Sequence, residues 1–331
     1  MALVLGIEST AHTFGIGIVR NEKVLANVRD MYVTEKGGII PVESAKHHVK
    51  VSHELYKKAL EISGIQEKEI DVVAFSQGPG LAPCLIQGMK FAKETSFRLK
   101  KPLIGINHCV SHLEIGKITG AKDPVMLYAS GANTQIIAYA SGKYRIFGET
   151  LDIGVGNFID NFARYAGIGF PGGPIIEKIS KQGENFIELP YKVKGMDITL
   201  SGILTNLKQK LESKKYPIED LSYSLQETVF AMLVETAERA LAHTGKKELL
   251  LGGGVACNSR LQEMCKIMCE ERGCKCFIPS RDLLVDNGAM IAFLGEIIFK
   301  SNPQEFSKEK IEKIDIHPRE RTDDIAVDWK N

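Results

Sequence analysis

The sequence predicts an α/β protein made of two similar folding units with a ligand cleft between them. Two observations support this prediction. Apolar, strand-like runs alternate with longer helical patterns in the first third of the chain, and a similar set of three strands starts again near residue 124. Strands that alternate with helices are typical of a sheet covered by helices. A chain of 331 residues that is 44% apolar is long enough to build two cores.

The first unit is expected to begin with three consecutive strands. These are the runs LVLGIES, FGIGIVR and KVLANVRD, joined by the short polar turns TAHT and NE. Residues 42–63 follow as a helix, because apolar positions recur on one side. A buried strand, DVVAF, then leads through the loop SQGPGLAP into a helix that ends at Leu99. The run KPLIGI is expected to be a further strand.

Two histidines follow that strand directly. In INHCVSHLEI, residues 106–115, His108 and His112 are four positions apart. On a helix this spacing places two imidazoles on the same face, which suits a metal ion. The same spacing also occurs on an ordinary, half-exposed helix face, where histidine has no ligand role. The spacing alone leaves both interpretations open.

The second unit is predicted from an internal repeat. The strands VMLYAS, TQIIAYA and YRIFGET, joined by GAN and SGK, match the first three strands in order and approximate length. The turns ESTAHTFG and SGANTQ would then face each other across a cleft and offer backbone N–H groups to phosphates. Two unrelated three-stranded hairpins remain the alternative.

The last third of the chain carries a glycine-rich turn. In ELLLGGGVACNSRLQEM a strand and three glycines precede a helix that Asn258 is expected to cap, and such a helix N-terminus can bind an anion. No P-loop or G-x-G-x-x-G motif is present, so a tight turn without a ligand remains open. In SRDLLVDNGAM, Asp286 stands before an expected helix over residues 288–300, and its ordinary role there would be the helix N-cap.

Composition narrows the class of protein. The chain has 42 Lys and Arg against 41 Asp and Glu, a net charge of +1, which is not typical of a protein that binds nucleic acid alone. The first residues lack a basic signal-peptide region, and no apolar run is long enough to span a membrane. Seven cysteines without an export signal favour the cytoplasm. Four of them lie in CKIMCEERGCKC, which has no C-x-x-C zinc spacing, and are expected in the core.

Seven motifs in order give a specific resemblance. They are GIESTAHTFGIGIV, FSQGPGL, NHCVSH, LYASGANTQ, GETLDIGVGNFID, FPGGP and DNGAM. Together they resemble the tRNA N6-adenosine threonylcarbamoyltransferase family. The similarity is to its archaeal and eukaryotic type, the catalytic subunit of the KEOPS complex, once described as O-sialoglycoprotein endopeptidase. The resemblance runs from Leu3 to the closing RTDDIAVDW and so covers nearly the whole chain.

The resemblance implies a fold and a metal site. The family has the duplicated actin-like, Hsp70-like and sugar-kinase-like (ASKHA) fold, with two RNase H-like domains around a nucleotide cleft. The expected division is 1–123 and 124–300 for the two subdomains, with 301–331 as a C-terminal tail. By motif match, one metal ion per subunit, iron or else zinc, would be held by four ligands: His108, His112, Tyr128 and Asp286. Two imidazoles and two oxygen ligands suit a Lewis-acidic iron centre.

The resemblance also implies a nucleotide site for ATP, AMP or threonylcarbamoyl-adenylate. By motif match, its residues would be Tyr128, Ala129, Ser130, Gly131, Ala132, Asn133, Asp160, Gly173, Glu177 and Asn258. The carboxylates of Asp160 and Glu177 would accept hydrogen bonds from the ribose. The family has two consecutive glycines where this chain has Gly131 and Ala132, so Ala132 would be strained if that position needs a positive φ.

The implied reaction is acyl transfer. A separate synthase makes threonylcarbamoyl-adenylate, and the N6 amine of adenosine 37, in tRNAs that read codons beginning with A, takes its threonylcarbamoyl group. Glu8 and His12 are the candidates for proton transfer. The implied partners are tRNA and the KEOPS subunits, including a small atypical kinase or ATPase and a small dimerising subunit, with no membrane.

Two other enzyme classes share part of the pattern. An ATPase or small-molecule kinase of the same fold would use the glycine-rich elements but has no need of the histidines. A metallopeptidase is less favoured, because Cys109 stands where a zincin has its catalytic glutamate.

Overall fold

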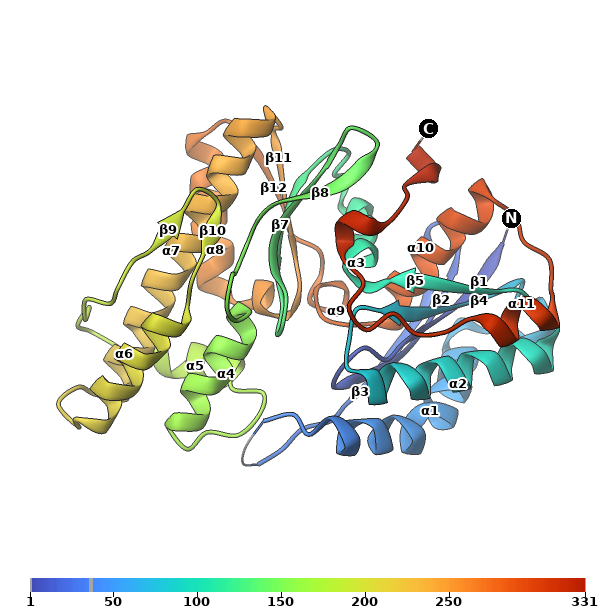
Figure 1. Cartoon of the computed structure of the whole chain (residues 1–331), viewed down its shortest axis with the longest axis horizontal. Coiled ribbons are helices and arrows are strands. Elements are labelled where there is room, and N and C mark those ends of the chain that lie inside the picture. The colour runs from blue at the N-terminus through green and yellow to red at the C-terminus, as the bar shows by residue number, and fades with distance from the viewer. Residues whose placement is uncertain (1, 36–37, 331) are drawn as a thin grey trace.

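The computed structural model describes residues 2–35 and 38–330 and contains two five-stranded mixed sheets (Figure 1). The strand order is β3-β2-β1-β4-β5 in the first sheet and β12-β11-β6-β7-β8 in the second. In each sheet a central strand pairs antiparallel with a meander on one side and parallel with later strands on the other. The two units thus have the same topology. The predicted duplicated α/β fold is confirmed.

The first sheet is built from the strands that the sequence predicts. Its strands are β1 (Leu3–Glu8), β2 (Thr13–Arg20), β3 (Lys23–Met31), β4 (Val72–Gly78) and β5 (Leu103–Asn107). Two long helices cover one face: α1 (Pro41–Ser63) packs on β2 and β3, and α2 (Ala82–Leu99) packs on β4. Both helices agree closely with the predicted ranges. A short 3-10 turn, Glu67–Glu69, joins α1 to β4.

The second sheet repeats this plan. Its strands are β6 (Val125–Ala129), β7 (Thr134–Ala140), β8 (Lys143–Glu149), β11 (Glu248–Gly252) and β12 (Lys275–Phe277). The helices associated with it are α4 (Val155–Tyr165), α5 (Gly173–Ser180), α6 (Ser201–Glu212), α7 (Ile218–Thr244) and α8 (Ser259–Glu271). A two-stranded hairpin, β9 (Val193–Lys194) and β10 (Asp197–Ile198), lies against β8 and α7. Cys265 and Cys269 are buried in the core of this unit, as expected, whereas Cys274 and Cys276 are only partly buried against it.

Two helices lie between the sheets (Figure 1). They are α3 (His108–Gly116), which contacts β11, and α10 (Gly288–Ser301), which packs on β1 and β2. Glycine allows this close packing, because a Cβ at Gly17 would lie only 2.1 Å from Ala289 N. α10 therefore packs on the first sheet although it belongs to the 124–300 range of the sequence. The division 1–123, 124–300 and 301–331 stays a prediction.

The C-terminal segment connects the two units. A short helix, α11 (Lys308–Lys313), packs on α2, and the 3-10 turn Thr322–Asp324 contacts β8. Between these contacts the chain passes beside the N-terminal end of α3, where Asn107 Nδ2 donates to Glu320 Oε2 at 2.9 Å. Among the described residues, every helix is too short or too polar to cross a membrane.

Candidate metal and nucleotide site

The helix α3 begins where the buried strand β5 ends. Asn107 is its N-cap, since the Asn107 side-chain oxygen accepts from Val110 N at 3.0 Å. The cap places His108 and His112 on one face of the first turns, and both side chains are buried, at 5% and 2% exposure. A half-exposed helix face therefore does not describe these histidines.

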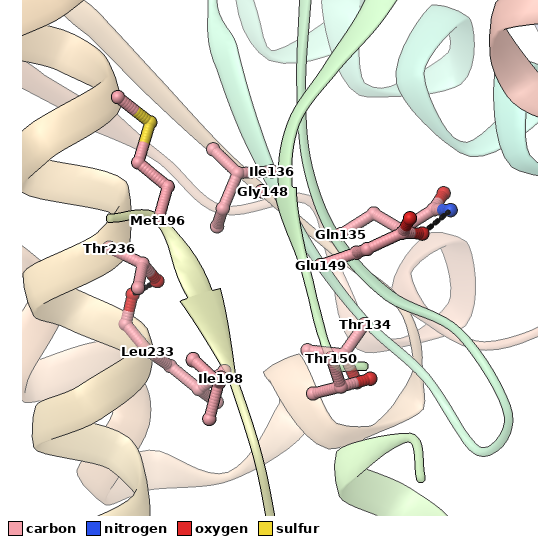
Figure 2. A pocket seen from close by; sticks show the side chains of 10 residues that line it. All are labelled: Thr134, Gln135, Ile136, Gly148, Glu149, Thr150, Met196, Ile198, Leu233 and Thr236. Carbon is pink, nitrogen blue, oxygen red and sulfur yellow. Dashed lines mark hydrogen bonds between the residues drawn. The ribbon is translucent and has the colours of Figure 1, made fainter. Parts of the chain in front are cut away.

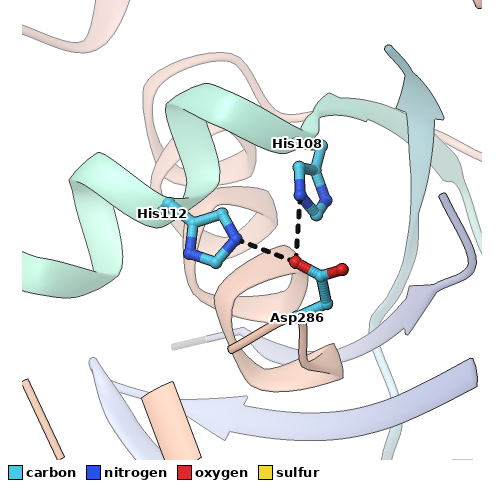
Figure 3. A group of neighbouring side chains, drawn as sticks. All are labelled: His108, His112 and Asp286. Carbon is cyan, nitrogen blue, oxygen red and sulfur yellow. Dashed lines mark hydrogen bonds and ion pairs between the residues drawn. The ribbon is translucent and has the colours of Figure 1, made fainter. Parts of the chain in front are cut away.

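Asp286 completes the group (Figure 3). Its Oδ1 lies 3.3 Å from His108 Nε2 and 3.3 Å from His112 Nε2. The sequence allowed Asp286 to be the N-cap of α10, and that interpretation was wrong. Asn287 is the cap, because its side-chain oxygen accepts from Met290 N at 3.0 Å. The carboxylate of Asp286 is thus free to turn towards the histidines.

These three side chains form a group that could hold a metal ion. One ligand atom from each lies within 4.8 Å of the others, and no second group of this kind occurs in residues 2–35 and 38–330. Two imidazoles and one carboxylate, with further positions open, are a donor set that suits iron(II). Tyr128, at the end of β6, is 1% exposed, and its ring centroid lies 5.1 Å from that of His112.

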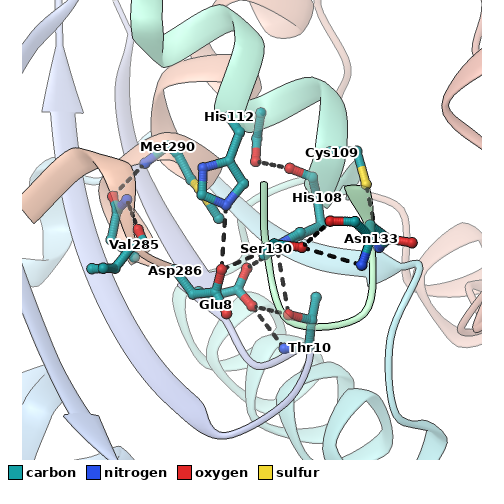
Figure 4. Close-up of polar contacts among 12 residues, drawn as sticks. Glu8, Thr10, His108, Cys109, His112, Ser130, Asn133, Val285, Asp286 and Met290 are labelled. Atoms are coloured by element: carbon teal, nitrogen blue, oxygen red, sulfur yellow. Dashed lines mark hydrogen bonds and ion pairs between the residues drawn. The ribbon is translucent and has the colours of Figure 1, made fainter. Parts of the chain in front are cut away.

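Glu8 orients His108 from the side opposite Asp286 (Figure 4). Its Oε2 lies 3.0 Å from His108 Nδ1, and its Oε1 accepts from Thr10 N at 2.7 Å and from the Thr10 hydroxyl at 2.6 Å. A carboxylate in this position holds the proton on Nδ1 and leaves Nε2 for a metal. Glu8 is fully buried, so its contacts support a role in orienting His108. Its predicted role in proton transfer stays a prediction.

The charges of the group depend on one another. Burial disfavours a charged imidazole, but the carboxylates of Glu8 and Asp286 raise the pKa of His108 well above its usual value. Burial likewise opposes ionisation of Asp286, yet His108 and His112 hold the pKa of that carboxyl well below its usual value. Burial lowers the pKa of His112, so this ring is neutral. These pKa shifts favour a charged His108 beside an ionised Asp286 and disfavour a charge on His112.

The predicted second-unit turn lies beside this group (Figure 4). Ser130 N donates to Asn133 O at 2.9 Å, which closes the turn, and Asn133 Nδ2 lies 3.9 Å from Cys109 Sγ on α3. The first residues of α4 hold the turn from the other side, because Gly156 N donates to Ser130 O at 3.0 Å. Ala132 is not among the described residues with a positive φ, so the expected strain is absent.

The glycine-rich turn after β11 approaches the same segment. Gly253 has a φ of 90°, and a Cβ there would lie 2.4 Å from Ala129 O. The turn leads into α8, whose N-cap is Asn258, as predicted, since Asn258 Oδ1 accepts from Arg260 N at 2.9 Å. Backbone N–H groups from two glycine-containing turns are thereby placed near each other, an arrangement that suits a phosphate.

The other predicted nucleotide residues lie around these turns. Asp160 Oδ1 accepts from Gly172 N at 2.8 Å, and Glu177 Oε1 accepts from Ser259 N at 2.9 Å. Gly173, the first residue of α5, has open space where a Cβ would stand. Burial raises the pKa of Asp160. The assignment of both carboxylates to a ribose stays a prediction.

His12 lies where the two units meet. Its ring packs edge-on against Phe170, with centroids 5.4 Å apart. Phe170 and Thr34 exchange backbone hydrogen bonds, at 3.0 and 3.2 Å, and so join a loop of the first unit to the loop before α5. The structure thus brings His12 near the predicted nucleotide residues. Its role in proton transfer remains a prediction.

A small pocket elsewhere does not compete with this site (Figure 2). It lies between β7, β8, β10 and α7 and is lined by Thr134, Gln135, Ile136, Gly148, Glu149, Thr150, Met196, Ile198, Leu233 and Thr236. Glu149 is its one ionisable residue, and its other members are apolar or neutral. It therefore offers no group of catalytic or metal-binding side chains.

Comparison with known proteins points to one family. The family model described as TsaD, tRNA N6-adenosine threonylcarbamoyltransferase, matches residues 23–293. A protein of that name from Thermococcus kodakarensis is 55% identical over 327 residues, which is 99% of each chain. A probable bifunctional tRNA threonylcarbamoyladenosine biosynthesis protein from Thermoplasma volcanium is 51% identical over 99% of this chain, which corresponds to 61% of its own length.

Solved structures support the fold. The chain is similar to HypF from T. kodakarensis, with a TM-score of 0.62 and 14% identity over 90% of this chain and 48% of that one. It also resembles the activator of 2-hydroxyisocaproyl-CoA dehydratase from Clostridium difficile, solved with bound ADPNP, with a TM-score of 0.53 and 12% identity over 92% of this chain and 99% of that one. At these identities the likeness shows shared architecture alone.

Proposed function

The chain belongs to the tRNA N6-adenosine threonylcarbamoyltransferase family, and from this membership we infer that it transfers a threonylcarbamoyl group to the N6 amine of an adenosine in tRNA. The inference is supported most directly by 55% identity over 99% of the chain to a relative of that name. The acceptor is proposed to be adenosine 37 of tRNAs that read codons beginning with A, and the donor threonylcarbamoyl-adenylate from a separate synthase.

The proposed metal ligands are His108, His112, Tyr128 and Asp286, with iron as the ion and zinc as the alternative. The convergence of two Nε2 atoms on Asp286 Oδ1, each at 3.3 Å, supports His108, His112 and Asp286 as ligands. The position of Tyr128 beside His112 is compatible with Tyr128 as a further ligand. A bound metal would supply positive charge for the threonyl end of the donor.

The residues of the chain then have distinct tasks. Glu8 keeps the proton of His108 on Nδ1, so that Nε2 faces the metal position. The AMP half of the donor would lie on the turns at Ser130–Asn133 and Gly253, whose backbone N–H groups suit its phosphate. Asp160 and Glu177 would accept from the ribose hydroxyls.

The transfer forms a bond between the adenosine N6 and the carbamoyl carbon and breaks the bond from that carbon to the phosphate oxygen. AMP leaves, and the attacking amine loses a proton. His12 and Glu8 are the proposed groups for this proton, and His12 is the better placed, because it lies where the units meet. Holding donor and amine in line supplies much of the rate enhancement in such reactions.

The proposed partners are the KEOPS subunits, including a small atypical kinase or ATPase and a small dimerising subunit. A net charge of +1 supports this proposal, because tRNA binding draws on many cationic contacts. The cytoplasm is the proposed location, where the seven cysteines would stay reduced. The test of the function is incorporation of labelled threonine into tRNA from added threonylcarbamoyl-adenylate. The double variant His108→Ala, His112→Ala should lose this incorporation.

A further inference from the structure

The segment His317–Asp324 is hydrogen-bonded to elements on several sides of the metal group. Pro318 O accepts from Gly80 N at 3.1 Å, which fixes the segment to the loop after β4. The same loop holds the first-unit turn, because Leu81 N donates to Thr10 O at 2.8 Å. Thr10 in turn is the hydrogen-bond partner of the carboxylate that orients His108. The C-terminal segment is therefore connected to Glu8 through the loop after β4 and Thr10.

A second contact reaches the start of α3 directly. Asn107 Nδ2 donates to Glu320 Oε2 at 2.9 Å, while Asn107 Oδ1 accepts from Val110 N at 3.0 Å. Asn107 is 5% exposed, and the Glu320 side chain is 16% exposed. Both ends of the amide are thus used, so its orientation is fixed. The next residue along the chain is the metal-group member His108.

A third contact ties the segment to the second unit. Thr322 is 2% exposed, and its hydroxyl donates to Gln135 Oε1 at 3.2 Å on β7. Gln135 lies two residues after the turn Ser130–Asn133. The segment thus joins both units at the place where their turns meet the metal group. A segment that served only to fix the end of the chain would not need to contact Asn107, the N-cap of α3.

We propose that Glu320 is a positioning residue for the metal group, acting through Asn107 on the start of α3. The proposal rests on the metal site assigned above and adds a residue that touches neither metal nor substrate. Losing Glu320 leaves the Asn107 amide without its acceptor and lets the first turn of α3 shift. The two Nε2 atoms then no longer converge. Groups hydrogen-bonded directly to a metal ligand typically change metal affinity by about 10–100-fold, and Glu320 acts one residue further out, so an effect at the lower end of that range is expected.

The test is a cobalt(II) titration of the full-length chain, followed by its visible absorption. Glu320→Ala should bind cobalt about 10-fold more weakly than the wild type, the lower end of the range for direct partners of metal ligands. Asn107→Asp should do the same, because it keeps the cap oxygen of α3 but sets a carboxylate against Glu320. The double variant Asn107→Asp, Glu320→Gln exchanges donor and acceptor, and it should recover most of the affinity. Glu312→Ala, exposed in the same part of the chain, is the control.

The outcomes separate the two proposals. A wild-type chain that binds no cobalt would overturn the metal site itself. A wild type that binds cobalt with the same affinity as Glu320→Ala would overturn the positioning role alone. If circular dichroism shows that Glu320→Ala does not fold, the test rests on Asn107→Asp and on the double variant Asn107→Asp, Glu320→Gln. If the double variant recovers the cobalt affinity that Asn107→Asp loses, the proposal is supported. If the double variant binds cobalt as weakly as Asn107→Asp, the proposal is overturned.

Discussion

Glu8 Oε2 lies 3.0 Å from Nδ1 of His108, across the ring from Asp286, so that one imidazole stands between two carboxylates. This relationship gives the two ring nitrogens different tasks. Nδ1 donates to a fixed, fully buried acceptor, and Nε2 is turned to the place where a metal would bind.

Removal of both histidines should abolish metal binding without unfolding the chain. Anaerobically purified wild type is expected to contain about one equivalent of iron, and the His108→Ala, His112→Ala variant almost none, because Asp286 and Tyr128 without the imidazoles hold iron(II) weakly. Elemental analysis measures the metal, and thermal unfolding checks the fold. His53→Ala, an exposed histidine on α1, is the control and should keep its metal. A full equivalent of metal in the double variant would contradict the assignment.

Loss of Glu177 should weaken nucleotide binding. Glu177→Ala removes an acceptor from the predicted ribose site and is expected to cost about 1–3 kcal/mol of binding free energy for an adenylate, measured by calorimetry. The carboxylate also accepts from the Ser259 hydroxyl, so Ser259→Ala tests whether that contact alone accounts for the effect. Lys178→Ala, the next residue along, should bind as the wild type does. Unchanged affinity in Glu177→Ala would remove it from the site.

Much of this site follows from local sequence patterns. The strands, the long helices, the Asn258 cap and the spacing of His108 and His112 all depend on residues close together in the chain. The role of Asp286 does not, since Asp286 and Asn287 are both good N-caps, and only the packing of α10 selects Asn287. Sequence patterns alone therefore pointed to Asp286 as the N-cap of α10, where the structure has Asn287.

Other parts depend on contacts between distant segments. Glu320 and Asn107 are 213 positions apart, and nothing in the run HPRERTDD indicates that it returns to the start of α3. The packing of α10 on the first sheet is of the same kind, because it depends on glycines in β1 and β2 that permit close approach. The sequence made Glu8 a candidate for proton transfer because it lies in the first-unit turn, but its contact with His108 Nδ1 required the folded structure.

Gly253 and Gly254 should respond differently to alanine. Gly253→Ala introduces a Cβ 2.4 Å from Ala129 O at a φ of 90°, and strain of this kind costs about 1–3 kcal/mol of stability or more. A Cβ at Gly254 meets no atom within 4 Å, so Gly254→Ala should be nearly neutral. Urea unfolding of the two variants measures the difference. Equal stability would mean that the turn does not approach Ala129 this closely.

His48 should make the chain less stable in mild acid. Burial and the neighbouring His47 lower the pKa of His48 from 6.5 to about 4. The unfolded chain takes up a proton at His48 below pH 6.5 while the folded chain does not, so the free energy of unfolding falls as the pH drops towards 4. The total contribution is about 3 kcal/mol. His48→Leu should flatten this part of the profile relative to wild type, whereas His53→Gln should leave it unchanged.

The isolated chain should modify tRNA poorly, and its partners should restore the reaction. With 42 basic and 41 acidic residues it has little net charge with which to hold a polyanion. Labelled threonine supplied as threonylcarbamoyl-adenylate should enter tRNA slowly with this chain alone. Addition of the proposed kinase-like and dimerising KEOPS subunits should raise the rate if they supply the cationic RNA contacts that this chain lacks. Guanosine has an oxygen in place of the N6 amine, so tRNA that carries guanosine at position 37 should accept no threonylcarbamoyl group. Transfer that is equally fast without partners would refute the partner requirement. Transfer that survives removal of His108 and His112 would refute the metal-assisted mechanism.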